Sequence, residues 1–158
     1  CLDIPEVLTL SSFYLMNSFP KKKFLLYGEK PFPKNLKKYD ILFFPQEFIS
    51  SIKANSTDIV INKYSLGEMN KKTVKKYILN IEKITNYFFH INQDFHYREF
   101  SKRKKNILAS DFRLNKNKFS LLVRYLDISH FIFDKFSNYN MDLFFHIYKK
   151  IKFKKNNV

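Results

Sequence analysis

The sequence has few of the residues that crosslink small proteins or bind metals. Of its 158 residues only Cys1 is a cysteine, which excludes an intrachain disulfide framework and a zinc site built on several thiolates. The longest apolar runs, such as ILFF at 41–44, are far shorter than the roughly 20 residues that a membrane-spanning helix needs. The first residues also lack the pattern of a signal peptide. We therefore expect a cytoplasmic protein with no membrane span.

Glycine is nearly as rare, with Gly28 and Gly67 the only two in the chain. The sequence has no glycine-rich phosphate-binding loop, no G-x-S-x-G nucleophile motif and no pair of carboxylates with a catalytic signature. Its histidines, at positions 90, 96, 130 and 146, form no H-x-x-x-H pair or comparable metal cluster. No metal site is predicted.

The composition suits one folded domain. The chain is 45% hydrophobic and 18% aromatic, which is enough for a core. We predict a single, incomplete domain over residues 1–151 and a basic tail over 152–158. Alternating strands, at 1–3, 23–27, 39–45, 58–62 and 87–92, and helices, at 5–19 and 70–86, indicate an α/β fold with a mostly parallel sheet.

Some segments outside this alternation are also assigned. The β-branched run DIVIN at 58–62 is typical of a strand buried on both faces of a parallel sheet. Residues 118–126 are predicted as a strand and 98–106 as a basic loop or helix. Residues 141–151, MDLFFHIYKKI, are predicted as an amphipathic terminal helix.

The net charge of +15 leaves two interpretations open. It permits a basic RNA- or anion-binding module, in which KRKKN at 102–106 and the tail contact phosphates while Tyr97 and Phe100 stack on bases. However, lysine heavily outnumbers arginine and alanine is almost absent, as in chains encoded by AT-rich DNA. On that interpretation the lysines lie scattered on solvated faces, and a nucleic-acid partner is not expected.

Polar residues follow the buried strand in the segment DIVINKYSLGEMN, 58–70. Ser65 and Glu68 match the S-x-x-E capping box, Gly67 permits a positive φ, and Asn70 caps the next helix. A structural role is thus sufficient for this turn. In open α/β sheets, however, ligands bind beyond the carboxyl ends of the strands, which makes the same turn a candidate site.

Two other segments place polar residues at such strand ends. His90 and Asn92 occur in YFFHIN, 87–92, where a histidine in an aromatic strand more often belongs to the core than to a site. Asp3 follows the first strand. There it either caps the helix that begins at Pro5 or accepts hydrogen bonds from a nucleotide ribose.

Several strings resemble the middle of bacterial sugar O-methyltransferases. They are LDIPE, the segment YDILFFP, and above all DIVINKYSLGEMNKKTVKKYI followed by YFFHIN. The resemblance covers roughly residues 2–95. It implies a class I S-adenosylmethionine-dependent methyltransferase with a Rossmann-like sheet and a sugar or glycan substrate.

The resemblance also implies roles for particular residues. Asp3, with Ile4, would face the ribose of S-adenosylmethionine, and Asn62 would line the cleft near the methyl group. Glu68 would be the base that accepts the hydroxyl proton, with His90 the second choice. The family's glycine-rich turn should precede Asp3. We therefore expect this chain to be the C-terminal portion of a longer methyltransferase, inactive alone.

Overall fold

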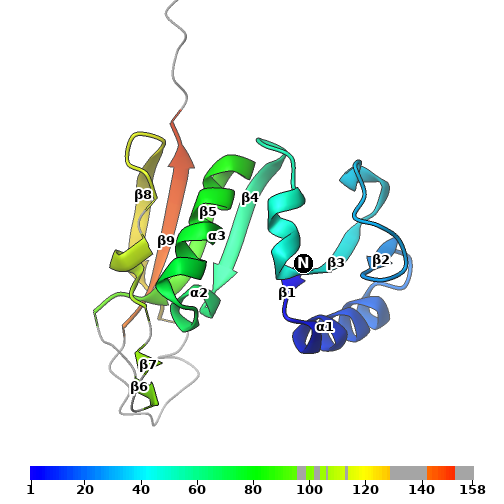
Figure 1. The fold of residues 1–158 in the computed structure, drawn as a ribbon, viewed down its shortest axis with the longest axis horizontal. Helices are drawn as coiled ribbons and strands as arrows, with labels where there is room; N and C mark the ends of the chain where they lie inside the picture. Colours follow the sequence, from blue (N-terminus) through cyan, green and yellow to red (C-terminus); the bar gives the residue numbers. More distant parts are fainter. Residues whose placement is uncertain (96–98, 102–103, 106, 113, 129–141, 152–158) are drawn as a thin grey trace, which may run out of the picture. The chain divides into compact units, whose positions relative to one another are not determined.

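The computed structural model describes residues 1–95, 99–101, 104–105, 107–112, 114–128 and 142–151 (Figure 1). The strands are β1 (Leu2–Asp3), β2 (Phe24–Leu26), β3 (Ile41–Pro45), β4 (Thr57–Lys63), β5 (Thr85–Gln93), β6 (Glu99–Ser101), β7 (Lys104–Lys105), β8 (Phe119–Leu126) and β9 (Leu143–Lys150). The α-helices are α1 (Pro5–Ser18), α2 (Ser65–Glu68) and α3 (Lys71–Ile84). The 3-10 helices are η1 (Leu36–Lys38), η2 (Gln46–Ser51) and η3 (Ala109–Phe112). The chain forms two compact units, Cys1–Ile52 and Lys53–Val158.

The first unit contains a three-stranded parallel sheet with the order β1-β3-β2. Helix α1 begins at Pro5, whose missing N–H costs nothing in the first turn. Phe44 is buried and has edge-to-face contacts with Phe32 and Phe48, 5.0 and 5.2 Å between ring centroids. These aromatic pairs form much of the small core of this unit.

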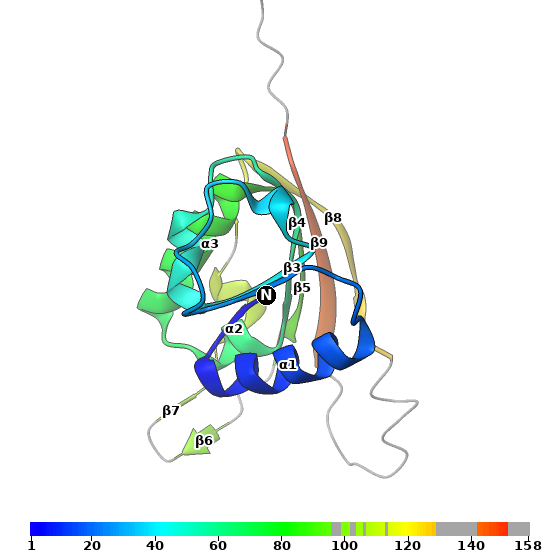
Figure 2. The same cartoon turned by 90° about the vertical axis from the view of Figure 1, so that its right-hand side faces the viewer.

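The second unit contains a four-stranded sheet with the order β4-β5-β9-β8. Strands β4 and β5 are parallel, and β9 runs antiparallel between β5 and β8. Helix α3 lies on one face of this sheet and η3 lies beside it (Figures 1 and 2). Parallel strands joined by a helix and an added antiparallel pair confirm the predicted α/β class.

Helix α3 forms where the sequence predicted it. Val74, Ile78 and Ile81 recur at helical spacing and are buried against the sheet. The side chain of Asn70 accepts a hydrogen bond from the Thr73 N–H at 2.9 Å, which satisfies one donor at the start of the helix. The predicted Asn70 cap is confirmed.

The prediction of a terminal helix over 141–151 is wrong. This segment contains β9, which pairs with β5 on one side and with β8 on the other. In LFFHIYKK, aromatic and β-branched residues are dense, and such residues favour strands. Two flanking strands that offer backbone hydrogen bonds outweigh the helical spacing of the apolar residues.

Strand β4 differs from its prediction in burial. It is parallel as expected, but it lies at an edge of its sheet, and the side chains of Ile59 and Ile61 are 46% and 64% exposed. On the other face of the strand, Val60 and Asn62 are half-buried. A continuous β-branched run is compatible with either arrangement, because it specifies a strand without specifying its neighbours.

The basic segment 98–106 is only partly described. Residues 99–101 and 104–105 form the antiparallel pair β6 and β7, so these residues are strands and neither loop nor helix. Tyr97, part of KRKKN and the tail 152–158 lie outside the described residues. None of the described helices is long and apolar enough to cross a membrane.

Candidate functional site

The parallel pairing of β4 and β5 brings two predicted site residues side by side. Asn62 is the register partner of His90, so their side chains lie on the same face of the sheet. The next residue on that face of β5 is Asn92. Three polar side chains from two strands thus meet close to the carboxyl ends of those strands.

The turn after β4 is not a capping box. Tyr64 occupies the N-cap position of α2 with φ 66°, in the left-handed region, and its side chain makes no capping hydrogen bond. Ser65 is the first helical residue, and its hydroxyl accepts a hydrogen bond from the Asn62 side chain. The Tyr64 N–H donates to the carbonyl of Ile91, at 2.9 Å. The turn is therefore held by β5, and a Ser65–Glu68 box is not needed.

Gly67 is required for space and not for a positive φ. Its φ lies outside the left-handed region. A Cβ at this position would lie 3.2 Å from the Ile107 carbonyl oxygen and 3.5 Å from Asn92 Oδ1. The Gly67 carbonyl also accepts a hydrogen bond from the Ile107 N–H at 2.8 Å. The glycine lets the segment near 107 approach the backbone of α2.

Asn92 links the turn to the strands. Its Oδ1 accepts from the Gly67 N–H at 3.2 Å, while its Nδ2 lies 3.3 Å from Asn62 Oδ1. The same Nδ2 lies 3.3 Å from Nδ1 of His90. Because the Gly67 N–H needs an acceptor, the amide is oriented with Nδ2 toward His90, and the neutral ring then carries its proton on Nε2.

His90 is enclosed by rings. Only 1% of its surface is exposed, and its ring packs against Phe112 and His146. Burial, with the positive field of His146 as a second cause, lowers the pKa of His90 to about 3. His90 is therefore neutral at physiological pH.

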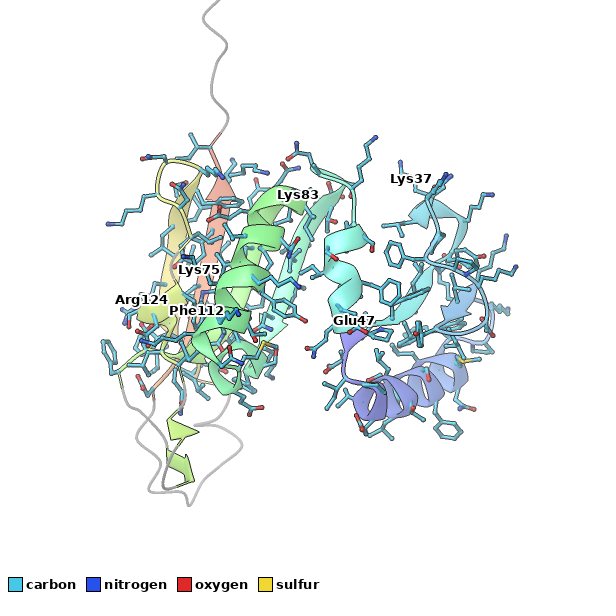
Figure 3. All side chains as sticks on the ribbon, viewed as in Figure 1. Lys37, Glu47, Lys75, Lys83, Phe112 and Arg124 are labelled. Atoms are coloured by element: carbon cyan, nitrogen blue, oxygen red, sulfur yellow. The ribbon has the colours of Figure 1, made fainter. Side chains whose placement is uncertain are left out.

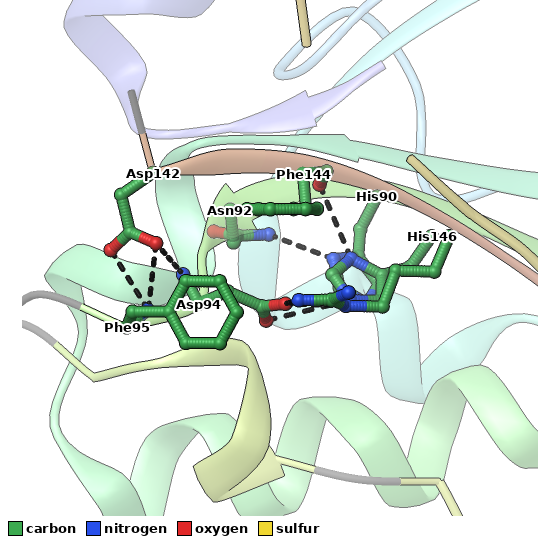
Figure 4. A network of polar contacts seen from close by, with 8 residues as sticks. His90, Asn92, Asp94, Phe95, Asp142, Phe144 and His146 are labelled. Atoms are coloured by element: carbon green, nitrogen blue, oxygen red, sulfur yellow. Dashed lines mark hydrogen bonds and ion pairs between the residues drawn. The ribbon is translucent and has the colours of Figure 1, made fainter. Parts of the chain in front are cut away.

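The polar contacts continue beyond His90 to the far strands (Figure 4). His146, its register partner on β9, lies with Nε2 3.5 Å from Asp94 Oδ1. Asp94 also accepts from Arg124 on β8, with 2.7 Å to Nε and 2.5 Å to the terminal nitrogen. Burial lowers the pKa of His146, and this effect is opposed by Asp94 and by the Phe144 carbonyl. A chain of polar groups thus crosses the sheet from Asn62 to Arg124.

The remaining predicted residues are Glu68 on α2 and, in the first unit, Asp3 and Ile4. Glu68 is exposed at the end of α2. Asp3 and Ile4 belong to the first unit, where Asp3 Oδ1 accepts from the Ile4 N–H at 2.8 Å at the carboxyl end of β1. The structure brings together Asn62 and His90, each in a contact with Asn92.

Sequence reasoning did not select His146, Asp94 or Arg124. The incorrect helix over 141–151 concealed the pairing of His146 with His90. Asp94 could have been selected from the sequence, because it directly follows β5 and polar residues at strand ends were the candidates for the site. Within the described part of the chain, no three His, Cys, Asp or Glu side chains are grouped so that they could hold a metal ion.

Comparison with known proteins shows a shared fold. No family model matches the chain, and no curated protein matches it. The PH0226 protein from Pyrococcus horikoshii OT3 is similar in structure, with a TM-score of 0.54 and 12% identity over 95% of this chain and 81% of that one.

Two further structures are more distant. A structure of LepI in complex with SAM has a TM-score of 0.46 at 9% identity, and the match covers 95% of this chain and 42% of that one. A "putative type 11 methyltransferase" from Sulfolobus solfataricus has a TM-score of 0.43 at 12% identity, with 99% of this chain and 86% of that one covered. At such identities a likeness extends to the fold alone.

Proposed function

We propose that this chain is part of an S-adenosylmethionine-dependent methyltransferase that acts on a sugar hydroxyl. The observation that carries the proposal is the meeting of Asn62 and Asn92 at the carboxyl ends of parallel β4 and β5. That edge is where open α/β sheets bind their ligands. The resemblance of residues 2–95 to sugar O-methyltransferases supports the same activity.

The chemistry of Asp3 suits the proposed contact with the ribose. The Asp3 carboxylate has one oxygen engaged by the Ile4 N–H, and an ionised carboxylate can accept several more hydrogen bonds. Ribose hydroxyls are suitable donors. Asn62 keeps its position through Ser65 and Asn92. When bound, S-adenosylmethionine supplies an electrophilic methyl group, and the chain's residues hold it and orient the acceptor.

Glu68 is proposed as the proton acceptor for the sugar hydroxyl. It is exposed, so a substrate reaches it without opening the core. His90 remains the second choice, and its burial and its pKa of about 3 weigh against it, because a general base works best with a pKa near the operating pH.

The cofactor proposal is tested by calorimetry. S-adenosylmethionine is titrated into the protein, and saturable binding is expected. Asp3→Asn should weaken binding, because it keeps the acceptor for the Ile4 N–H but loses the charge that holds the ribose hydroxyls. Asp40→Asn is the matched control, since Asp40 also accepts from a backbone N–H, that of Lys23 at 2.8 Å. Equal affinities in both variants would remove Asp3 from the site.

The proton acceptor is tested by methyl transfer. Labelled S-adenosylmethionine is offered with a panel of monosaccharides and nucleotide sugars. Glu68→Gln should lower kcat by about 10²-fold or more while the affinity for the cofactor is unchanged. Glu47→Gln, which changes an exposed carboxylate in the first unit, is the control and should retain full activity (Figure 3). Transfer to none of the sugars, with the cofactor bound, would contradict the sugar assignment.

A further inference from the structure

The second unit contains a pocket of about 590 Å³ on the face of the sheet that carries Arg124 and His146. Its lining includes residues of β8 and β9, the 3-10 helix residues Ala109 and Ser110, and Asp94 and Phe95 after β5. Its size lies within the range of pockets that enclose small ligands, about 300–1,000 Å³. The pocket lies within one unit, so its geometry is independent of how the units are arranged.

The walls are largely apolar. Leu114 and Phe119 are buried and line the side near η3. Tyr148 lies on β9 and Leu121 on β8, and Leu121 is 47% exposed. Such walls favour a ligand with an apolar, flat body, because rings stack well on aromatic side chains.

The charges of the lining favour one negative charge on the ligand. Asp94 engages Arg124 through Nε and one terminal nitrogen, and a guanidinium carries five N–H donors, so further donors remain on Arg124. Lys116 is exposed and adds a second cation to the lining. The lining thus contains two cations, Arg124 and Lys116, and one carboxylate, that of Asp94, so these three side chains carry a surplus of one positive charge.

The position of the Arg124 side chain is set by its neighbours. The guanidinium carbon of Arg124 lies 4.1 Å from the centroid of the Phe144 ring, and the side chain of Asp94 is only 9% exposed. Asp94 also contacts the buried His146, so Arg124 is oriented by the half-buried Phe144 ring and by a carboxylate that is itself held in place. A preorganised guanidinium loses little entropy when it binds a carboxylate.

We propose that this pocket binds a small aromatic carboxylate, with the ring against Phe119 and Tyr148 and the carboxylate toward Arg124 and Lys116. The proposal is separate from methyl transfer. It requires neither a cofactor nor any residue of the first unit.

Calorimetry with benzoate tests the proposal on the whole chain. Benzamide has the same ring without the charge, and acetate has the charge without the ring. Benzoate is expected to bind at one site per chain and at least about tenfold more tightly than either, which corresponds to roughly 1.4 kcal/mol. Failure of benzoate to bind saturably, or binding no tighter than that of benzamide, would overturn the proposal.

Two neighbouring residues of β8 provide a matched pair of variants. Leu121 lines the pocket and Leu122 does not, although they are 47% and 51% exposed. Leu121→Glu places a negative charge beside the carboxylate of the ligand and should weaken the binding of benzoate by about tenfold. Leu122→Glu changes the net charge equally and should leave its affinity within about twofold. Equal losses in the two variants would assign any binding to overall charge and refute the pocket.

A second pair separates the contribution of Lys116. Lys116→Gln should weaken the binding of benzoate and leave the affinity for benzamide unchanged. Lys75→Gln removes an exposed lysine on α3 that does not line the pocket (Figure 3), and it should change neither affinity. Thermal unfolding of all four variants checks that each is folded. A Lys116 variant with the affinity of the Lys75 variant would contradict the role given to this cation.

Discussion

The rings of His90 and His146 stack across the antiparallel pair β5 and β9, with 4.4 Å between centroids and 15° between planes. Both side chains are buried. Burial lowers the pKa of each, to about 3 for His90. Protonating both imidazoles in this arrangement costs free energy. We therefore expect acid to destabilise the second unit through these two side chains.

Stability is predicted to fall as the pH decreases below 6.5. An unfolded His90 has a pKa near 6.5, whereas the folded pKa is about 3. Between these values the unfolded chain binds a proton that the folded chain does not, so unfolding is favoured in acid and full stability is present above pH 6.5. Each unit of pH costs about 1.4 kcal/mol in this window. Denaturant unfolding at several pH values measures the slope.

The control for this prediction is His90→Phe, which keeps a ring in the same place. Between pH 6.5 and pH 5, the free energy of unfolding should fall by about 2 kcal/mol less in this variant than in the unaltered protein. A parent and a variant with the same pH dependence would mean that the carboxylates alone cause the acid sensitivity.

Replacing Gly67 by alanine is predicted to destabilise the second unit by about 1–3 kcal/mol, because the new Cβ must displace the Ile107 carbonyl. The Gly67–Ile107 hydrogen bond lies at the same place, so it should weaken as well. Urea unfolding measures the change. Glu68→Ala, at the adjacent exposed position of α2, serves as the control, and an equally large effect there would refute the steric explanation.

Asn70→Ala is predicted to cost about 1 kcal/mol, since the Thr73 N–H loses its side-chain acceptor at the start of α3. Asn70→Ser should recover most of the loss, because serine is also a good N-cap. The comparison variant is Asn80→Ala, whose amide donates to the Lys76 carbonyl inside the helix. In urea unfolding, Asn70→Ala should have a lower free energy of unfolding than Asn80→Ala. The reverse order would contradict the capping role.

Asp94 and Arg124 are predicted to be energetically coupled. A double-mutant cycle of Asp94→Asn and Arg124→Gln should give a coupling energy of about 1 kcal/mol, because each single variant leaves the other charge without its partner. Arg124 is partly exposed, with 37% of its side chain accessible, which limits the effect through solvent screening. Additive losses would show that the pair contributes no specific interaction.

Local pattern was sufficient where a segment's structure depends on its own residues. The apolar stripe of α3, its Asn70 cap and the Pro5 start of α1 followed from spacing and side-chain chemistry. The parallel pairing of β4 and β5 followed from the alternation of strands and helices. The meeting of Asn62 and His90 is a consequence of that pairing.

The sequence by itself thus determined the class of fold and the edge at which polar residues gather, because short-range propensity and periodicity are encoded locally. Only the tertiary structure decided that 143–150 is a strand, since its hydrogen bonds go to β5 and β8. It likewise decided that Tyr64 and not Gly67 adopts a positive φ, because the turn is held from β5 and the space at Gly67 is taken by Ile107. Contacts between residues far apart in the chain are not written in any one segment.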